Sequence, residues 1–500
     1  MSFICFFSLI NIIFLSCASL AAFFINLYIE HIYKVYYHYF HFIFIYVFLF
    51  TLYICLNFNF LNFVILDLNF NFMQIIFFFN IILLILVIAL AFCWLLFYYE
   101  SSFFFFNEFY IILSFIAIAF QFILISADFL FLYLGIELLS FCTYIFASFT
   151  RFGNIFVEAV LKYFLIGTFA SCFMLYGLSL FYWIFVTTSF IDVCCYLELF
   201  LINNFFFKIF LISLTLIFIT FFIKLALGPF GLWIADLYQG TALPFIFLVS
   251  TIIKIVFYIY LLIFIWCFFF DCINYFWITF EIINLLSLII GNFFSISERS
   301  LIRLISYSTL PNIGLFSCFN IFSYNEILNL NVFFFLVYIL NFVILFLPFF
   351  KQGSLFYKQK FSWDLIEFIV LKKNKFFFTL WIMAFFSLSG MPPFLIFFFK
   401  FTSNLNFFFE SELFVLVIYL FSILSMYYYN YVLISFFFKK GFFLFLQEDI
   451  LINDFFHGFT STFFNNITWQ FALSWQMICM KLLPSIYLIQ PFFFFHFFSI

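Results

Sequence analysis

The chain has 500 residues, of which 69% are hydrophobic and only 8% charged, and its formal net charge is −3. Its mean hydropathy is +1.30, and several apolar runs exceed the ~20 residues that a helix needs to cross a bilayer. This composition excludes a water-soluble globular domain and predicts an all-α polytopic membrane protein.

Residue usage is strongly biased towards a few apolar types. The chain contains 108 phenylalanines but only 13 glycines, as expected of a T-rich organellar genome. We therefore interpret aromatic runs as lipid-facing filler, whereas a lysine inside an apolar run opposes the bias and is informative.

The 12 cysteines include no C-x-x-C pair and are interpreted as structural. No histidine lies between residues 42 and 456, so we expect no haem or copper in the central body.

Apolar runs separated by polar residues, glycine or proline predict fourteen spanning helices. They are placed at 3–28, 40–65, 74–98, 107–126, 129–148, 158–184, 207–228, 241–266, 274–294, 301–322, 328–350, 376–402, 412–437 and 464–490. The first run lacks a basic region before it and is long for a signal peptide, so we expect it to be the first span.

The basic residues favour this arrangement, because lysine and arginine prefer the non-translocated side of a membrane. Connections between successive spans alternate between the two sides of the membrane. Twelve basic residues flank connections on the same side: Lys34, Arg151, Arg299, Arg303, Lys351, Lys358, Lys360, Lys372, Lys373, Lys375, Lys439 and Lys440. Only Lys208 flanks a connection on the opposite side. Both termini are therefore predicted on the translocated side, with the loop at 351–375 facing the interior.

Two predicted spans contain helix-breaking sequences at corresponding places. The seventh contains Gly228-Pro229 and the twelfth contains Gly390-Met391-Pro392-Pro393. Interrupted helices at matching positions in two halves are typical of the binding sites of transporters, although proline is also common in membrane helices generally. The breaks predict two inverted five-helix repeats, at 101–266 and 267–437. A three-helix segment at 1–100 precedes them, and a C-terminal helix with its flanks at 438–500 follows.

Five ionisable residues lie inside the apolar spans: Glu137, Lys162, Lys224, Lys254 and Lys400. A charge at bilayer depth costs about 2.5–3.5 kcal/mol on insertion-based scales, and such residues mark ion or proton paths. In a dry helix bundle, desolvation weakens proton binding by a lysine, and a nearby carboxylate strengthens it again. Embedded lysines with movable partners therefore predict a proton relay.

The roles of the five differ with their surroundings. Glu137 has no basic residue near it on its own helix, and Lys224 is its candidate partner on another helix. Lys162 follows Glu158 by four residues, so an ordinary helix-surface ion pair remains an alternative to a functional role. Lys400 ends its span and could snorkel to the interface, but a helix continuing past the proline break would hold it deeper. Asp128, Asp236, Asp271 and Glu298 are expected at the ends of spans, where charge is readily solvated.

No nucleotide-binding loop and no cluster of metal-spaced Cys or His occurs, so we expect no redox centre and no cofactor in this chain.

Five stretches resemble chain 2 of the proton-pumping NADH:ubiquinone oxidoreductase, respiratory complex I, a family related to cation/proton antiporters. They are ADFLFLYLGIELLSFCTYIFASF, VEAVLKYFLIGTFASCFMLYG, FFIKLALGPFGLWIADLYQG, ERSLIRLISYSTLPNIG and FFSLSGMPPFLIFFFKF, and together they cover roughly residues 121–403 in order. The EAxLKYF run and the D-x-Y-x-G motif favour chain 2, and Lys400 argues against the sister chain 4, which is acidic there.

This resemblance implies a fourteen-helix fold with inverted repeats and a mitochondrially encoded subunit of the inner membrane, with both termini in the intermembrane space. It implies a Glu137–Lys224 pair and a relay through Lys254 towards Lys400, and Lys162 also matches a family position. The expected partners are the antiporter-like chain 4, small membrane subunits and phospholipids, but no nucleic acid, with flavin and iron–sulfur clusters in other subunits. One departure is Asn312, where the family often has a histidine and where an amide cannot titrate.

Three functions remain open from the sequence. The chain is expected to be a membrane-arm subunit of an NADH:ubiquinone reductase that couples electron transfer in other subunits to proton pumping. The alternative is a stand-alone cation/proton antiporter. A structural scaffold that has lost transport is disfavoured, because four lysines and a glutamate persist against the coding bias.

Overall fold

Almost all of the central part of the chain is helical. The computed structural model describes residues 108–126, 128–148, 154–189, 192–193, 204–265, 273–298, 300–322, 337–346, 375–391 and 412–438, with positions 394, 396, 397 and 400. No β-strand occurs within these ranges, which confirms the all-α fold class. The predicted spans at 3–28, 40–65, 74–98 and 464–490 lie outside the described residues, and so do the histidines.

The first half begins with long apolar helices that match the predicted spans. They are α4 (Glu108–Ile125), α5 (Phe129–Ser148), α6 (Asn154–Phe185) and α8 (Asn204–Leu225). Apolar side chains surround these helices on all sides, and many hydroxyls donate to the carbonyl three residues earlier, as Ser140 does to Glu137 at 2.8 Å. Such bonds satisfy polar groups where no water is present.

The seventh predicted span is interrupted, and its helix ends three residues before the predicted bound of 228. Helix α8 ends at Leu225, an irregular segment covers 226–232, and the chain resumes in α9 (Trp233–Gly240). The next crossing is also irregular, with α10 (Leu243–Leu248), a π-helical turn η1 (Val249–Ile253) and α11 (Lys254–Ile263). Neither the second half-helix nor the π turn was predicted.

The second half repeats long helices and a break. It contains α12 (Ile273–Ser297), α13 (Leu301–Phe322), a short helix at 337–346, α16 (Lys375–Ser389) and α18 (Glu412–Phe438). Helix α16 stops at Gly390, which has φ of +76°. Glycine adopts this left-handed conformation without the steric cost that a side chain adds, so the second predicted break is confirmed.

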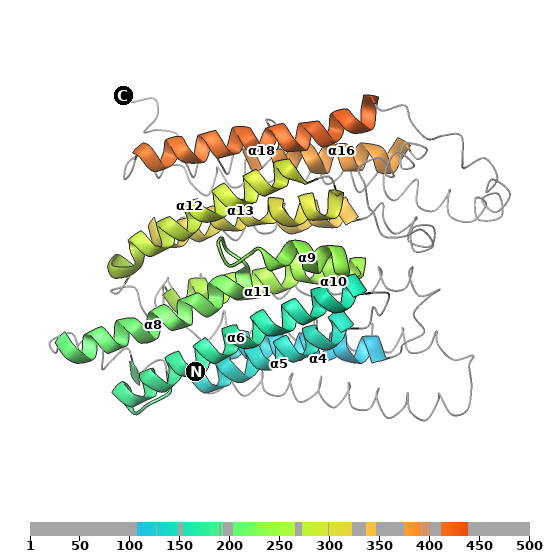
Figure 1. The fold of residues 1–500 in the computed structure, drawn as a ribbon. Helices are drawn as coiled ribbons and strands as arrows, with labels where there is room; N and C mark the ends of the chain where they lie inside the picture. The colour runs from blue at the N-terminus through green and yellow to red at the C-terminus, as the bar shows by residue number, and fades with distance from the viewer. Residues whose placement is uncertain are drawn as a thin grey trace, which may run out of the picture.

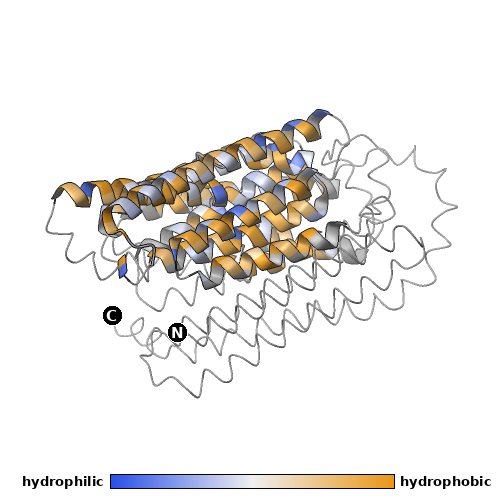
Figure 2. Cartoon of the chain, turned by 90° about the horizontal axis from the view of Figure 1, so that it is seen from below, coloured by the Kyte–Doolittle hydropathy of each residue, from blue (hydrophilic) through white to orange (hydrophobic). Residues whose placement is uncertain are grey.

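The helices form one bundle in which the broken elements are central. In Figure 1, α4, α5 and α6 lie on one side, α16 and α18 on the other, and α9 to α11 between them. Hydrophobic residues dominate nearly every described helix in Figure 2, with scattered hydrophilic positions. Five of the described helices are long and apolar enough to cross a membrane, namely Phe129–Ser148, Phe156–Phe185, Phe205–Leu225, Ile278–Ser297 and Leu416–Ile434.

Close packing at the first break fixes the two halves together. A Cβ on Gly228 would lie 2.7 Å from the Ser287 Cα in α12, so only glycine fits there. The segment after α8 is therefore held directly against the backbone of α12. This contact places the end of α8, with Lys224 in its last turn, beside the centre of the bundle.

Candidate functional site

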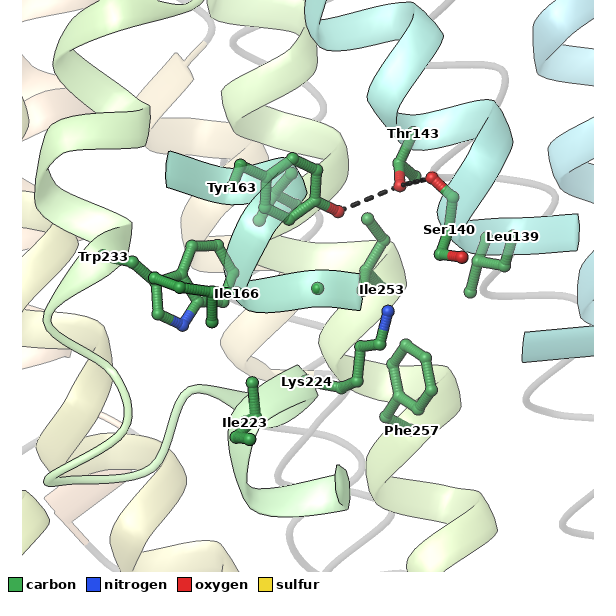
Figure 3. Close-up of a pocket in the computed structure, with 12 residues that line it drawn as sticks. Leu139, Ser140, Thr143, Tyr163, Ile166, Ile223, Lys224, Trp233, Ile253 and Phe257 are labelled. Carbon is green, nitrogen blue, oxygen red and sulfur yellow. Dashed lines mark hydrogen bonds between the residues drawn. The ribbon is translucent and has the colours of Figure 1, made fainter. Parts of the chain in front are cut away.

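Lys224 faces a small, mostly apolar cavity at the first helix break. Its side chain points into a space lined by residues of α5, α6, α8, α9, η1 and α11, shown in Figure 3. The cavity has a volume of about 20 Å³, and a buried water needs roughly 10–15 Å³ on this measure. Ser140 and Thr143 line it together with Tyr163, whose hydroxyl lies 2.9 Å from the Thr143 hydroxyl. The cavity therefore has room for about one water within reach of these hydroxyls.

Glu137 lies next to this cavity but makes no direct ion pair with Lys224. Ser140 joins the two regions, because its hydroxyl lies 3.4 Å from Oε2 of Glu137 and also lines the cavity. Of the ion pairs between described residues, none involves either side chain. The Lys224 ammonium lies 5.8 Å from the centre of the Tyr144 ring. The structure leaves Glu137 and Lys224 without a direct contact, and the pair stays a prediction.

Lys254 lies at the start of α11, directly after the π turn, and is only 1% exposed. Its ammonium donates a hydrogen bond of 2.7 Å to the hydroxyl of Thr309 in α13. The preceding residue, Ile253, lines the Lys224 cavity. Lys254 therefore follows directly after the cavity lining and contacts α13 through a neutral partner.

Lys400 lies at the second break and is buried, with 8% of its surface exposed. Its side chain covers Gly390: a Cβ on this glycine would lie 3.3 Å from the lysine Nζ. The break thus holds Lys400 inside the protein, in agreement with the deeper of the two positions considered from the sequence.

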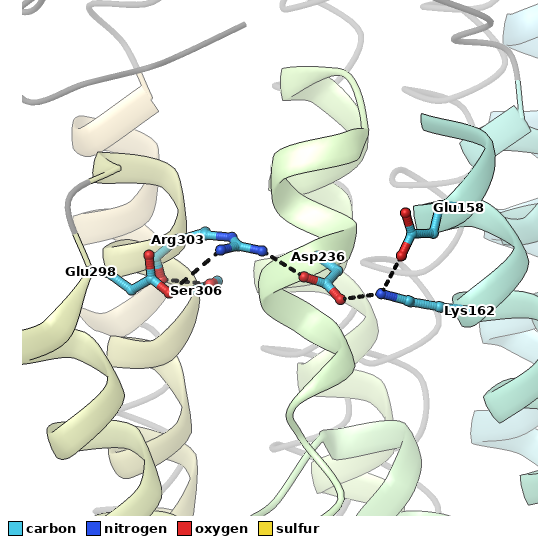
Figure 4. Close-up of polar contacts among 6 residues, drawn as sticks. All are labelled: Glu158, Lys162, Asp236, Glu298, Arg303 and Ser306. Carbon is cyan, nitrogen blue, oxygen red and sulfur yellow. Dashed lines mark hydrogen bonds and ion pairs between the residues drawn. The ribbon is translucent and has the colours of Figure 1, made fainter. Parts of the chain in front are cut away.

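Lys162 belongs to a separate charged network that joins three helices. It pairs with Glu158 at 2.7 Å, as the spacing predicted, and with Asp236 of α9 at 2.8 Å. Asp236 also binds Arg303 of α13 at 2.8 Å, and Arg303 lies 3.7 Å from Glu298. Figure 4 shows Asp236 between the two cations. Asp236 was expected at a span end, and the structure places it in the short helix α9, between α6 and α13, with 33% of its side chain exposed.

Sequence reasoning missed Thr309, Tyr163 and Asp236 as members of these sites. Tyr163 stacks on Trp233 with ring centres 5.3 Å apart, which fixes its hydroxyl towards Thr143. All three act across helices that are distant in the chain, and a single sequence shows no such contacts. Within the described ranges, no group of three or more His, Cys, Asp or Glu could hold a metal, and the absence of a cofactor stays a prediction.

Comparison with known proteins identifies the family of this chain. A family described as NADH:quinone oxidoreductase/Mrp antiporter, TM, matches residues 126–426, more than half of the chain. The chain belongs to this family. Its members include antiporter-like subunits, so the resemblance noted from the sequence is confirmed at this level.

Relatives of the NADH:quinone oxidoreductase/Mrp antiporter family match at moderate identity. NADH-quinone oxidoreductase subunit N of Ruthia magnifica subsp. Calyptogena magnifica is 28% identical over 298 residues, which are 58% of this chain and 60% of that protein. The subunit N of Wolbachia sp. subsp. Brugia malayi (strain TRS) is 30% identical over 317 residues, 62% of this chain and 65% of that protein. The chain therefore spans less than two thirds of the length of these curated relatives.

Solved structures share the fold of the family. A chain of respiratory complex I from Thermus thermophilus with bound aureothin has a TM-score of 0.64 and 19% identity, covering 86% of this chain and 91% of that chain. A chain of the membrane-bound sulfane sulfur reductase, an archaeal respiratory membrane complex, has a TM-score of 0.71 and 16% identity, covering 86% and 89%. The Mrp complex from Dietzia sp. DQ12-45-1b gives a TM-score of 0.64 and 15% identity, covering 73% and 67%.

Proposed function

We propose that the chain is a proton-translocating membrane-arm subunit of an NADH:ubiquinone oxidoreductase, in which the redox centres lie in other subunits. The observation that carries this proposal is the burial of Lys254, whose ammonium has a neutral hydroxyl as its hydrogen-bond partner. A buried ammonium paired with a hydroxyl is poorly compensated, so it serves a reaction better than it serves stability. Family membership and the two helix breaks support the same conclusion.

The residues suggest an order of proton movement. Glu137 biases the protonation of Lys224 through space, and Lys224 exchanges a proton with the water-sized cavity beside Ser140. Lys254 receives the proton and passes it laterally towards Lys400, which hands it to the exit half-channel. Each transfer moves one proton from a donor nitrogen or water to the next acceptor, so no oxidant or reductant is needed in this chain.

Lys162 fits this scheme less directly. Its ammonium is held by two carboxylates, and a lysine so paired keeps its proton firmly. We propose that it contributes to the relay by fixing α6 against α9, next to the cavity that Tyr163 lines.

The finer identity is also proposed here. The strongly biased composition supports a mitochondrially encoded chain 2 in the inner membrane, with both termini in the intermembrane space. The proposed repeats at 101–266 and 267–437 each contain one interrupted helix. Chain 4, small membrane subunits and phospholipids are the proposed neighbours, with flavin and iron–sulfur clusters elsewhere in the complex.

Substitution of the first charged pair tests this function in the assembled complex. Lys224→Ala and Glu137→Ala should each lower proton pumping and quinone reduction together, by about tenfold or more, since they remove groups of the relay. Lys208→Ala is the matched control, because Lys208 is an exposed lysine of the same helix. Unchanged pumping in both Lys224→Ala and Glu137→Ala would contradict the proposal.

The alternative is a stand-alone cation/proton antiporter, which the joint family description favours as a second candidate. Gentle solubilisation of the native membrane separates the two. Migration of the chain with flavin and iron–sulfur subunits supports the respiratory complex, and an isolated oligomer supports the antiporter.

A further inference from the structure

The aromatic ring of Tyr144 in α5 faces the ammonium of Lys224. The ammonium lies over the ring, 5.8 Å from its centre. A cation over the face of a tyrosine ring within about 6 Å is attracted by the ring's π electrons, most strongly where water is excluded. Tyr144 is only 8% exposed, so the contact lies inside the protein. The ring is therefore in position to stabilise the protonated form of Lys224.

The other polar groups around Lys224 do not replace this contact. Among the described residues, Lys224 forms no ion pair with Glu137. Ser140, Thr143 and Tyr163 line the cavity with neutral hydroxyls, and those of Thr143 and Tyr163 lie 2.9 Å apart and bond to each other. Neutral hydroxyls compensate a buried charge poorly, so the ring face supplies an attraction that they lack.

Aromatic contacts with α6 fix the orientation of the Tyr144 ring. It meets Tyr163 and Phe164 edge to face, with ring centres 5.0 Å and 5.3 Å apart. Tyr163 stacks in turn on Trp233 of α9, at 5.3 Å. Edge-to-face and offset-stacked pairs favour defined ring orientations. The ring is thus connected by packing to α9, the helix after the first break, whereas Lys224 belongs to the helix before it.

Gly167 of α6 leaves the space that the Tyr144 side chain occupies. A Cβ on Gly167 would lie 2.8 Å from Cζ of Tyr144 and would clash with its hydroxyl. This hydroxyl is buried and completes no hydrogen bond of standard geometry with a described residue. An unpaired buried hydroxyl costs free energy, so the hydroxyl does not explain the position of the side chain. The contacts of the ring do.

We propose that Tyr144 is a positioning residue of the relay, whose ring holds the Lys224 ammonium at the cavity and stabilises its charge. This inference rests on the proposed function. The ring itself neither gives nor takes a proton, so no step is added to proton transfer. Loss of the ring should let Lys224 release its proton more readily, whereas loss of the hydroxyl alone should leave the contact intact.

Truncation of the ring tests the inference in the assembled complex. Tyr144→Leu should move the alkaline limb of the pH dependence of proton pumping to lower pH by about 0.5–1 unit, because Lys224 then loses its proton earlier as the pH rises. Tyr144→Phe keeps the ring and should hold this limb near its parent position. Gly167→Ala displaces the ring and should shift the limb in the same direction as Tyr144→Leu.

The titratable side chains around Lys224 come from several elements. Glu137 and Tyr144 belong to α5 and Tyr163 to α6, while Lys254 directly follows η1. No described residue of α12 lines the cavity. The variants at positions 144 and 167 leave Glu137, Tyr163 and Lys254 in place. A shift seen with Tyr144→Leu but not with Tyr144→Phe is therefore assigned to the ring.

The matched control is Phe146→Leu. Phe146 belongs to the same helix, is 2% exposed, and packs its ring on Phe245 at 5.4 Å. Its replacement should leave the alkaline limb in place even if it lowers the amount of complex. An equal shift in Phe146→Leu, or in Tyr144→Phe, would overturn the inference.

A parent-like limb in Tyr144→Leu at normal subunit content would also overturn the role of the ring, while loss of pumping in Lys224→Ala would still support the relay. Should Tyr144→Leu fail to assemble, a parent-like limb in Gly167→Ala overturns the inference equally.

Discussion

At the scale of single residues, the pairing of Lys254 with Thr309 governs the chemistry of the centre. A carboxylate in place of the hydroxyl would hold the proton on the lysine more firmly. The Thr309 hydroxyl accepts from Lys254 and donates at 2.7 Å to the Ser306 carbonyl, so it is oriented by its own helix. Thr309 therefore gives Lys254 a neutral, oriented acceptor that does not compensate a charge on the buried ammonium.

We expect Thr309→Val to destabilise the subunit by about 1–3 kcal/mol, because it leaves a buried donor without its acceptor at unchanged volume. The added change Lys254→Leu should recover most of this loss, since no buried charge then remains. Thermal unfolding of the purified complex measures both effects.

The control for this substitution is Thr220→Val. Thr220 is likewise buried, but its hydroxyl only donates to the Ile217 carbonyl of its own helix. Equal destabilisation by Thr220→Val and Thr309→Val would show that the contact with Lys254 has no special weight.

The sequence points to the embedded charges but not to their neutral partners. An embedded lysine such as Lys254 is conspicuous in an apolar run, because its insertion cost is large. Thr309 looks like an ordinary residue of its helix, and its contact with Lys254 arises only from packing across the bundle. The ion pairs of Asp236 could not be predicted for the same reason, since both of its cations lie on other helices.

At the scale of elements, irregular helix segments place the functional groups. Lys224 precedes the gap between α8 and α9, Lys254 follows the π turn, and Lys400 follows the break after α16. Interrupted helices free backbone groups and admit polar atoms at membrane depth where protein surrounds them, and π turns are frequent at functional sites. Gly-Pro sequences revealed the breaks, whereas the π turn depends on tertiary contacts that leave no local signal.

The short helix α9 is expected to depend on Asp236 for its position. Asp236→Asn should destabilise the subunit by about 1 kcal/mol, because it weakens two partly exposed ion pairs, to Lys162 and Arg303. A double-mutant cycle with Lys162→Met, followed by thermal unfolding, should give a measurable coupling between the two residues. Asp192→Asn, at an exposed site, is the control. Strict additivity would mean that the contact contributes nothing.

At the scale of the whole molecule, the order of helices determines which groups face each side of the membrane. Predicted bounds and observed helices agree for α5 and α13, since long apolar runs leave little choice of structure where backbone groups need internal partners. The fourteen-helix count and the sides of the termini stay predictions, because the first three predicted spans and the last lie outside the described residues.

Labelling at two helix starts tests the orientation. Figure 1 shows α6 and α8 running in opposite directions, so their first turns should face opposite sides of the membrane. Asn154→Cys and Lys208→Cys occupy exposed positions there. An impermeant thiol reagent should label each variant in vesicles of only one orientation. It should reach Asn154→Cys from the side that corresponds to the interior. Gain of label by both from the same side would contradict the arrangement.

The neutral hydroxyl opposite Lys254 has one more consequence. In the proposed relay, a neutral hydroxyl can accept a proton from either neighbour, so this contact gives proton transfer no preferred direction. Net flow would then be imposed at the two ends of the relay, by the Glu137 carboxylate at one and by whatever sets the occupancy of Lys400 at the other.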